Sequence, residues 1–176
     1  MQDRSFLTAP TAALVAALVV SATAVLAGEP NGEWLVEDGL ARIRVEKCTD
    51  RYWGVVSWEK TPGGLDTANP DPAKRTRPTL GMPILLGMAT ASDPDAWEGE
   101  IYNSRNGKTY SARIILKQPD VLRVEGCLVG GFLCGGQNWS RVPPPPPQGR
   151  PPTAAQIQAA VADFCSKLPV LPGTPH

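Results

Sequence analysis

The feature that most constrains the fold is the stretch of residues 97–141, in which short strand-like runs alternate with turn signals. Turn-forming residues at 103–107, at 118–120 and at Gly130-Gly131 divide this stretch into four consecutive strands. In the two middle strands, apolar side chains alternate with polar ones, so that each strand has one apolar face. One such face consists of Tyr110, Ala112, Ile114 and Leu116. A run of hairpins with one apolar face is an antiparallel meander whose two edges must be paired or covered.

The preceding sequence supplies four more predicted strands. Asp38-Gly39 is a strong hairpin signal between strands at residues 32–36 and 40–46, and further strands are expected at residues 52–58 and 80–89. Gly81 and Pro83 indicate that the last of these strands is irregular at its start. An eight-stranded antiparallel up-and-down meander closes into a small barrel whose interior is filled by side chains or holds one small ligand. We therefore predict an all-β, lipocalin-like barrel, with an open sandwich of the same strands as the alternative.

The two ends of the chain have a different character from the barrel, which is expected over residues 28–142. Residues 1–27 resemble a Sec-type signal peptide, because an apolar run too short to span a bilayer precedes a small-x-small cleavage pattern at residues 25–27. We expect a periplasmic or secreted protein with no integral membrane span after cleavage; a retained N-terminal helix is the alternative.

The C-terminal part of the chain divides into three short segments. Residues 143–152 predict a polyproline linker, residues 153–168 a short amphipathic helix with Thr153 as its N-cap, and residues 169–176 a tail. Two arrangements of the helix remain open at this point. It either docks on the barrel or belongs to a loosely ordered tail.

Export permits disulfides among the four cysteines of the sequence. A two-residue turn at Gly130-Gly131 places Cys127 opposite Cys134, at a separation that a disulfide accepts, and this bridge would fix the register of the hairpin. A bridge between Cys48 and Cys165 would tether the C-terminal helix to the barrel. Buried free thiols are the alternative.

The sequence offers no catalytic or metal-binding constellation. The only histidine is His176, which excludes serine–histidine and cysteine–histidine arrangements inside the domain, and the cysteines lack the paired spacing of a zinc site. Glu98, Glu100 and Tyr102 share one face of a predicted strand, where we expect the two glutamates to point to water. Asp66, Asn69 and Asp71 in the long loop have the composition of a calcium loop without its spacing, and we expect a turn-rich loop there. We expect no cofactor and no metal.

The charge and the tryptophans bound the remaining functions. A formal net charge of zero, from 17 basic and 17 acidic residues, gives no broad electrostatic case for nucleic acid or an anionic membrane as partner. Barrel closure would make the strand that opens with Trp34 a neighbour of the strand that ends with Trp139 and Arg141. Arg141 would then lie across the face of Trp34 as a cation–π contact.

A ligand site is predicted at the barrel mouth bordered by residues 59–80, a segment of unusual length for a loop without periodicity. The candidate ligand-binding residues are Trp58, Arg75, Arg77 and Trp97. Arg75 and Arg77 have the alternative role of pairing with nearby aspartates.

Six motifs in order resemble those of the bacterial family called domain of unknown function 2147. They are G-x-W at 32–34, R-x-R-P-x-L-G at 75–81, W-x-G-x-I-Y-N at 97–103, G-K-T-Y at 107–110, L-x-V-x-G-C at 122–127 and C-x-x-Q-x-W-x-R at 134–141. The family implies exported single-domain proteins without an established activity, and its members often carry a second cysteine shortly after the first, which Cys48 lacks here. The first and last motifs also resemble those of lipocalin-type barrels, which is analogy at the level of fold.

These expectations lead to a non-enzymatic exported barrel that binds a small apolar or amphiphilic molecule or an envelope component. The alternative from another class is a structural or protein-interaction module with a filled barrel. The third hypothesis is an enzyme that uses Glu98, Glu100, Arg75 or Arg77. An open apolar interior distinguishes the first function from the second.

Overall fold

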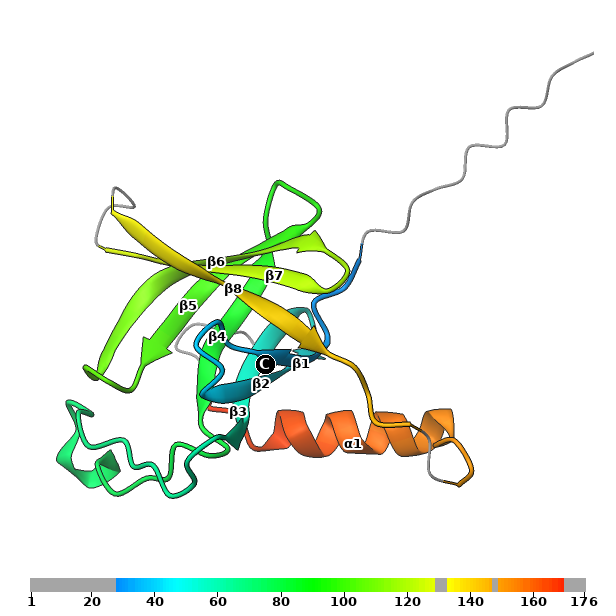
Figure 1. The fold of residues 1–176 in the computed structure, drawn as a ribbon, viewed down its shortest axis with the longest axis horizontal. Helices are drawn as coiled ribbons and strands as arrows, with labels where there is room; N and C mark the ends of the chain where they lie inside the picture. Colours follow the sequence, from blue (N-terminus) through cyan, green and yellow to red (C-terminus); the bar gives the residue numbers. More distant parts are fainter. Residues whose placement is uncertain (1–27, 129–132, 147–148, 170–176) are drawn as a thin grey trace, which may run out of the picture.

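The structure is a computed structural model that describes residues 28–128, 133–146 and 149–169. The predicted signal peptide and the Gly130-Gly131 turn lie outside the described residues. The described residues form eight strands followed by one α-helix (Figure 1). The strands are β1 (Gly32–Leu35), β2 (Ala41–Cys48), β3 (Arg51–Glu59), β4 (Pro83–Thr90), β5 (Ala96–Asn103), β6 (Lys108–Gln118), β7 (Val121–Cys127) and β8 (Cys134–Val142). A short 3₁₀ helix, η1 (Pro72–Lys74), lies between β3 and β4, and α1 (Ala154–Ser166) follows β8.

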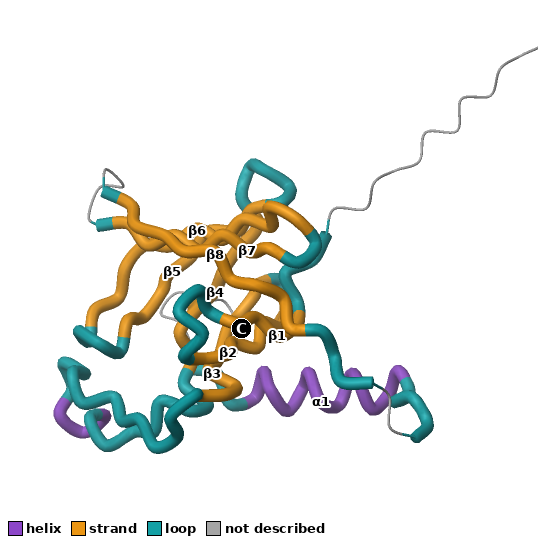
Figure 2. Tube along the Cα trace, in the orientation of Figure 1, coloured by secondary structure: helices purple, strands orange, loops and turns teal. Residues whose placement is uncertain are grey.

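The strands form a closed barrel. Each strand pairs antiparallel with the next, and β8 pairs with β1, where Trp34 lies opposite Arg141. No strand of the barrel is left with a free edge, as the continuous orange sheet in Figure 2 illustrates. The predicted meander and its closure are therefore confirmed, and the open sandwich is excluded.

The core follows the alternation of the sequence. Ala112 and Ile114 of β6 are buried, whereas Glu98 and Glu100 of β5 are exposed as expected. Trp97 contacts the ring of Tyr52 edge-on, with 5.4 Å between the ring centroids. The largest fully buried side chains of the barrel include Trp34, Trp139, Ile43, Leu85, Met88 and Leu122.

The strand predicted from residue 80 begins later, at Pro83. Gly81 has a φ of +82°, and its N–H donates to the carbonyl oxygen of Val56. The N–H of Val56 donates to the carbonyl oxygen of Met82. This irregular turn, which the left-handed conformation of a glycine permits, connects the long loop to β3 before the regular ladder of β4 begins. Leu80 is consequently exposed and not part of the strand.

Arg141 closes the end of the barrel at which β8 finishes. Its guanidinium carbon lies 4.1 Å from the centroid of the Trp34 ring, and its nitrogens donate to the backbone carbonyls of Pro119, Asn31 and Glu29. Burial lowers the pKa of Arg141 from its ordinary value, against the opposing charge of Asp120. This arrangement, which we call the closed end, joins the first strand, the last strand and the β6–β7 turn.

Two disulfides join elements that the sequence separates. Cys127 and Cys134 face each other at the ends of β7 and β8, with 4.0 Å between their Cα atoms. Cys48 at the end of β2 is bonded to Cys165 in α1, with 5.6 Å between Cα atoms. The helix, capped by Thr153, lies against β2 (Figure 1), and none of its residues is fully buried. The disulfide is thus a principal attachment of α1.

Candidate functional site

An open cavity of about 730 Å³ occupies the end of the barrel opposite the closed end. We call this end the mouth; it is formed by the β1–β2, β3–β4 and β5–β6 connections and by the described residues of the β7–β8 connection. The inner wall is apolar and is formed by Ile43, Val56, Ile84, Ile101, Val124 and Trp139. The rim is polar and carries Asp38, Glu59, Lys60, Thr61, Asn103, Arg105 and Gln137. An apolar interior with a polar rim suits one small amphiphilic molecule.

Glycines leave room for this cavity at the β7–β8 hairpin. Gly126 and Gly135 lie opposite each other in the ladder, and both line the cavity. A Cβ added to Gly135 would meet no atom within 4 Å, and one added to Gly126 would come within 3.3 Å of Ile101. Gly135 therefore faces open space, so that the interior at this end is not filled by side chains.

A charge pair spans the mouth. Arg105 in the β5–β6 turn donates to Asp38 in the β1–β2 turn at 2.9 Å, and these two turns lie half a barrel apart in the strand order. Both side chains are exposed, and exposed ion pairs contribute only about 0–1 kcal/mol. The contact joins opposite sides of the rim, but an ion pair this weak would not by itself prevent a ligand from entering.

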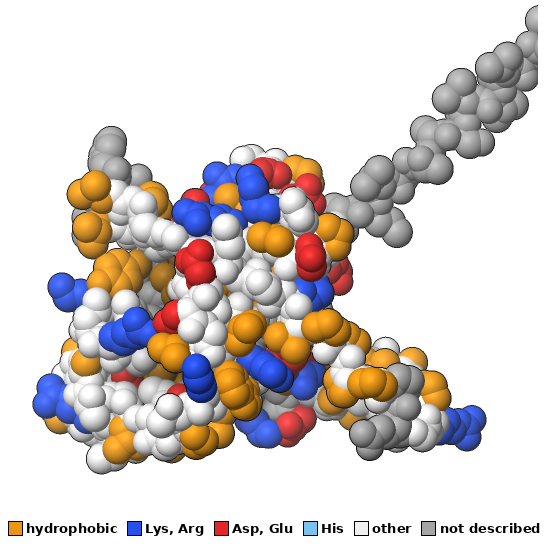
Figure 3. Space-filling view, in the orientation of Figure 1, with side chains coloured by type: hydrophobic (Ala, Val, Ile, Leu, Met, Phe, Trp, Pro, Cys, Tyr) orange, Lys and Arg blue, Asp and Glu red, His pale blue; other side chains and the backbone are white. Residues whose placement is uncertain are grey.

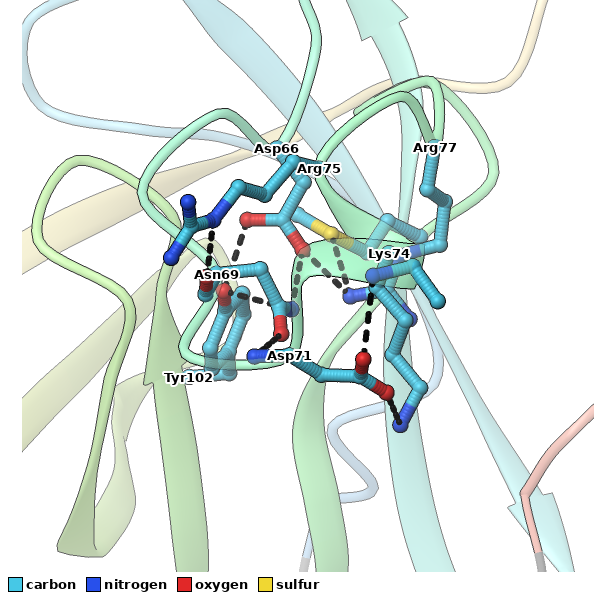
Figure 4. A network of polar contacts seen from close by, with 9 residues as sticks. Asp66, Asn69, Asp71, Lys74, Arg75, Arg77 and Tyr102 are labelled. Carbon is cyan, nitrogen blue, oxygen red and sulfur yellow. Dashed lines mark hydrogen bonds and ion pairs between the residues drawn. The ribbon is translucent and has the colours of Figure 1, made fainter.

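The long β3–β4 loop, residues 60–82, is fixed to the barrel by a buried carboxylate (Figure 4). Asp66 has no exposed surface, and it accepts hydrogen bonds from the Tyr102 hydroxyl at 2.6 Å and from Asn69 Nδ2 at 2.6 Å. Arg77 completes the set with an ion pair at 2.7 Å. We call these four residues the Asp66 cluster. Since Tyr102 also lines the cavity, the cluster connects the loop to the cavity wall.

The electrostatics of the Asp66 cluster favour a charged carboxylate. Burial alone would raise the pKa of Asp66, but the hydrogen bonds from Tyr102, Asn69 and Arg77 and the positive charge of Arg77 outweigh burial and hold that pKa below its ordinary value. Burial and the neighbouring carboxylate raise the pKa of Tyr102. Asp66 is therefore an ionised acceptor and Tyr102 a neutral donor at neutral pH.

The loop also packs against the β5–β6 turn. Gly107 has a φ of +68°, and a Cβ placed on it would lie 1.9 Å from the carbonyl oxygen of Ala68. Arg75 donates through Nε to the carbonyl oxygen of Asn69 at 2.9 Å, and this hydrogen bond stabilises the turned conformation of residues 69–75. Only glycine allows this close approach of the two backbones.

The four residues predicted to bind a ligand do not line the cavity. Trp58 lies on the outer face of β3, where the guanidinium of Arg42 stacks at 4.9 Å from its ring. Trp97 is buried in the core at 4% exposure. Arg75 and Arg77 hold the β3–β4 loop; of these, Arg77 pairs with an aspartate, the alternative role that the sequence offered. A direct contact of any of the four with a ligand stays a prediction.

Two features of the site escaped sequence reasoning. Alternation placed Tyr102 on the solvent face with Glu98 and Glu100, yet its hydroxyl reaches Asp66 across the loop. Trp139, considered for barrel closure, also lines the cavity with its indole. The signals were Tyr102 within W-x-G-x-I-Y-N and Arg77 within R-x-R-P. These two motifs meet at Asp66 only because the β3–β4 loop folds against β5.

Two general properties of the described residues bear on the site. Among them, no group of three or more histidine, cysteine or acidic side chains is placed to hold a metal ion. No helix within residues 28–128, 133–146 and 149–169 has the length and apolar character needed to cross a bilayer.

The closed eight-stranded meander with a cavity at one end defines a lipocalin-like barrel. The chain belongs to the family described as "Uncharacterized protein conserved in bacteria (DUF2147)", which its sequence matches over residues 32–141. Its fold is similar to that of protein HP1028 from the human pathogen Helicobacter pylori, described as belonging to the lipocalin family. The TM-score is 0.61 and the identity 17%, with 80% of this chain and 97% of the other covered, so the likeness concerns the fold. No curated protein is similar enough to count as a match.

Proposed function

We propose that this protein binds a small amphiphilic molecule in the mouth cavity, with the apolar part of the ligand inside and its polar part at the rim. The cavity carries the proposal, because its volume of about 730 Å³ lies within the usual range for small-molecule sites. Apolar side chains such as Ile43 and Val124 would gain about 25 cal/mol for each Å² that a ligand removes from water. The rim charges remain at the solvent boundary, where a polar head group keeps its hydration.

The alternative of a purely structural barrel is less well supported. A filled interior would leave no cavity, whereas Gly135 faces open space here. Catalysis is also less well supported by the polar groups available. Asp38 is paired with Arg105, Glu59 accepts a hydrogen bond from Thr79, and Glu98 and Glu100 are on the outer surface. We therefore propose binding without turnover.

A cavity-filling variant tests this proposal directly. In Gly135→Phe the new ring would enter the cavity, and in the control Asn138→Phe the same ring would stand on the outer face of the same strand. Binding of the fluorescent apolar amine N-phenyl-1-naphthylamine should weaken at least tenfold in Gly135→Phe and remain unchanged in Asn138→Phe. Equal affinity in both variants, or no binding by the unmodified protein, would reject the cavity as the binding site.

We also propose that the protein is exported to the periplasm or beyond, with residues 1–27 as its signal peptide. The two disulfides of the described residues support an oxidising compartment. Intact-mass measurement of protein from the periplasmic fraction should give a chain that begins at Gly28. The same measurement under native conditions would detect a molecule that co-purifies with the barrel.

A further inference from the structure

The exposed apolar side chains of this protein gather at the mouth. Seven large apolar side chains among the described residues are well exposed, and six of them belong to the mouth connections or to the adjoining end of β3. The six are Leu40, Trp58, Leu65, Leu80, Leu128 and Leu133. The seventh, Ile157, is on α1. Single exposed apolar residues are ordinary, but their concentration around the opening of an apolar cavity indicates a contact surface.

The shape of this surface differs from a flat protein interface. In Figure 1 the neighbouring ends of β7 and β8 and the β3–β4 loop lie on the same side of the barrel but at separate parts of the rim, and Figure 3 shows hydrophobic side chains at both places. Leu133 at the hairpin is 70% exposed, and Leu80 in the loop is 52% exposed. Apolar tips that stand apart around an opening can each enter a soft interface, whereas a rigid protein partner that covered all of them would also cover the cavity.

The charges of the mouth fit a lipid interface. The described residues at the ends of β7 and β8, 126–128 and 133–136, contain no charged side chain, so that Leu128 and Leu133 could enter the head-group region without desolvating a charge beside them. Asp38, Asp66 and Asp71 are each paired with an arginine or a lysine of the same chain, whereas Glu37 in the β1–β2 connection is exposed and has no ion pair among the described residues. Lys60 and Lys108 are exposed beside the opening and have no hydrogen-bond or ion-pair partner for their amines among the described residues. Lysines next to apolar tips are positioned to meet lipid phosphates.

From these observations we propose that the mouth docks on the surface of a lipid bilayer, with the leucine tips in the interface and the cavity facing the lipid. The bound state would expose the cavity to amphiphiles held in the membrane. This docking does not depend on the identity of the cavity ligand, nor on its presence. It concerns residues that are separate from the inner wall of the cavity.

Sedimentation with sucrose-loaded phosphatidylcholine vesicles, using the full chain with both disulfides intact, tests the docking. The unmodified protein should partition to the vesicles, and Leu128→Ser/Leu133→Ser should lower the partition coefficient roughly tenfold or more, because two apolar anchors are lost. The control Ile157→Ser changes an equally exposed side chain on α1 and should partition like the unmodified protein. Leu65→Ser/Leu80→Ser supplies a second, independent loss at the opposite part of the rim.

A second arm adds phosphatidylglycerol to the vesicles. Binding should become several-fold tighter, and Lys60→Gln/Lys108→Gln should remove that gain while leaving binding to phosphatidylcholine unchanged. Absence of vesicle binding, or equal binding by the leucine variants, would overturn the proposal. Concentration-dependent dimers that the same serine variants abolish would assign the surface to a second copy of the chain. Because the naphthylamine assay contains no lipid, failure of docking and failure of ligand binding are distinguishable.

Discussion

At the scale of single residues, Asp66 has the largest structural consequence in the site. It is fully buried, and it satisfies a hydroxyl, an amide and a guanidinium at once. Hydrogen bonds to an ionised acceptor are stronger than neutral ones, so three of them offset the cost of burying the carboxylate. The β3–β4 loop therefore has a defined position despite lacking regular secondary structure over most of its length.

Replacing the carboxylate of Asp66 should destabilise the protein. In Asp66→Asn one acceptor becomes a donor that faces the donors of Tyr102, Asn69 and Arg77, and we expect a loss of about 2 kcal/mol in the free energy of unfolding. Urea denaturation measures the loss. The control Asp71→Asn removes an exposed partner of Lys74 and should cost less than about 0.5 kcal/mol. Equal effects of the two changes would contradict the assigned role.

The same carboxylate predicts a pH dependence. Because the folded protein lowers the pKa of Asp66, the charged form stabilises the fold above the unfolded-state value of about 3.9, and that contribution is lost as pH falls through the folded pKa. The difference in unfolding free energy between the unmodified protein and Asp66→Asn should therefore shrink as the solution is acidified below about pH 4. Denaturation series at several pH values would show it; a constant difference would argue against the cluster.

Sequence reasoning reached only part of this residue-scale detail. The pairing of Arg77 with an aspartate was among the expected alternatives, but its burial and its link to Tyr102 were not. Strand alternation assigns a side chain to one face, and it cannot show that a loop later folds over that face. Asp66 and Tyr102 are 36 positions apart in the chain, and no local periodicity records their contact.

At the scale of elements, the strands were predictable because alternation and turn signals agree with each other. The hairpins of β5 to β8 are present as predicted, because the alternating side chains of these strands place their apolar residues on the face that packs into the core. The irregular start of β4 was predictable from Gly81 and Pro83, but the residue at which the regular strand begins was not, because it depends on hydrogen bonds to β3. The sequence left the docking of α1 open, because its apolar face is short. In the structure none of the residues of α1 is buried, which agrees with weak packing of the helix.

Removing the tether of α1 should release the helix. A 13-residue helix is marginal on its own in water, so Cys48→Ser/Cys165→Ser should lose helical ellipticity while the barrel remains folded. Stability should fall by at most about 5 kcal/mol, because the bridge closes a loop across a sequence separation of 117.

The control for the helix tether is Cys127→Ser/Cys134→Ser. It opens a loop with a separation of only 7, for which the same chain-entropy relation gives about 2.5 kcal/mol, and α1 should stay in place. Circular dichroism separates the two effects, because helical and strand signals differ. Retained ellipticity in the Cys48→Ser/Cys165→Ser variant would mean that packing against β2 alone holds the helix.

At the scale of the whole molecule, the barrel separates stability from recognition between its two ends. The closed end joins the first and last strands through Arg141 and Trp34, and burial there raises the pKa of Tyr52 to about 12, with Glu29 adding to the shift. The mouth has an open cavity, loops of unequal length and exposed leucines. Closure was predictable from the number and order of the strands. The volume of the cavity was not, because it depends on how fully the side chains fill the interior.

Changes at the two ends should therefore affect different measurements. Arg141→Met keeps much of the side-chain length but loses the stacked charge over Trp34 and the bonds to three carbonyls, so we expect a loss of about 2–4 kcal/mol in unfolding free energy. Its affinity for N-phenyl-1-naphthylamine, measured where the variant is fully folded, should equal that of the unmodified protein. Gly135→Phe should show the reverse, with weaker binding and little change in stability, because the added ring enters open space. If Arg141→Met weakened binding as strongly as Gly135→Phe, the two ends would be coupled, and the cavity would have to be regarded as shaped by the closed end.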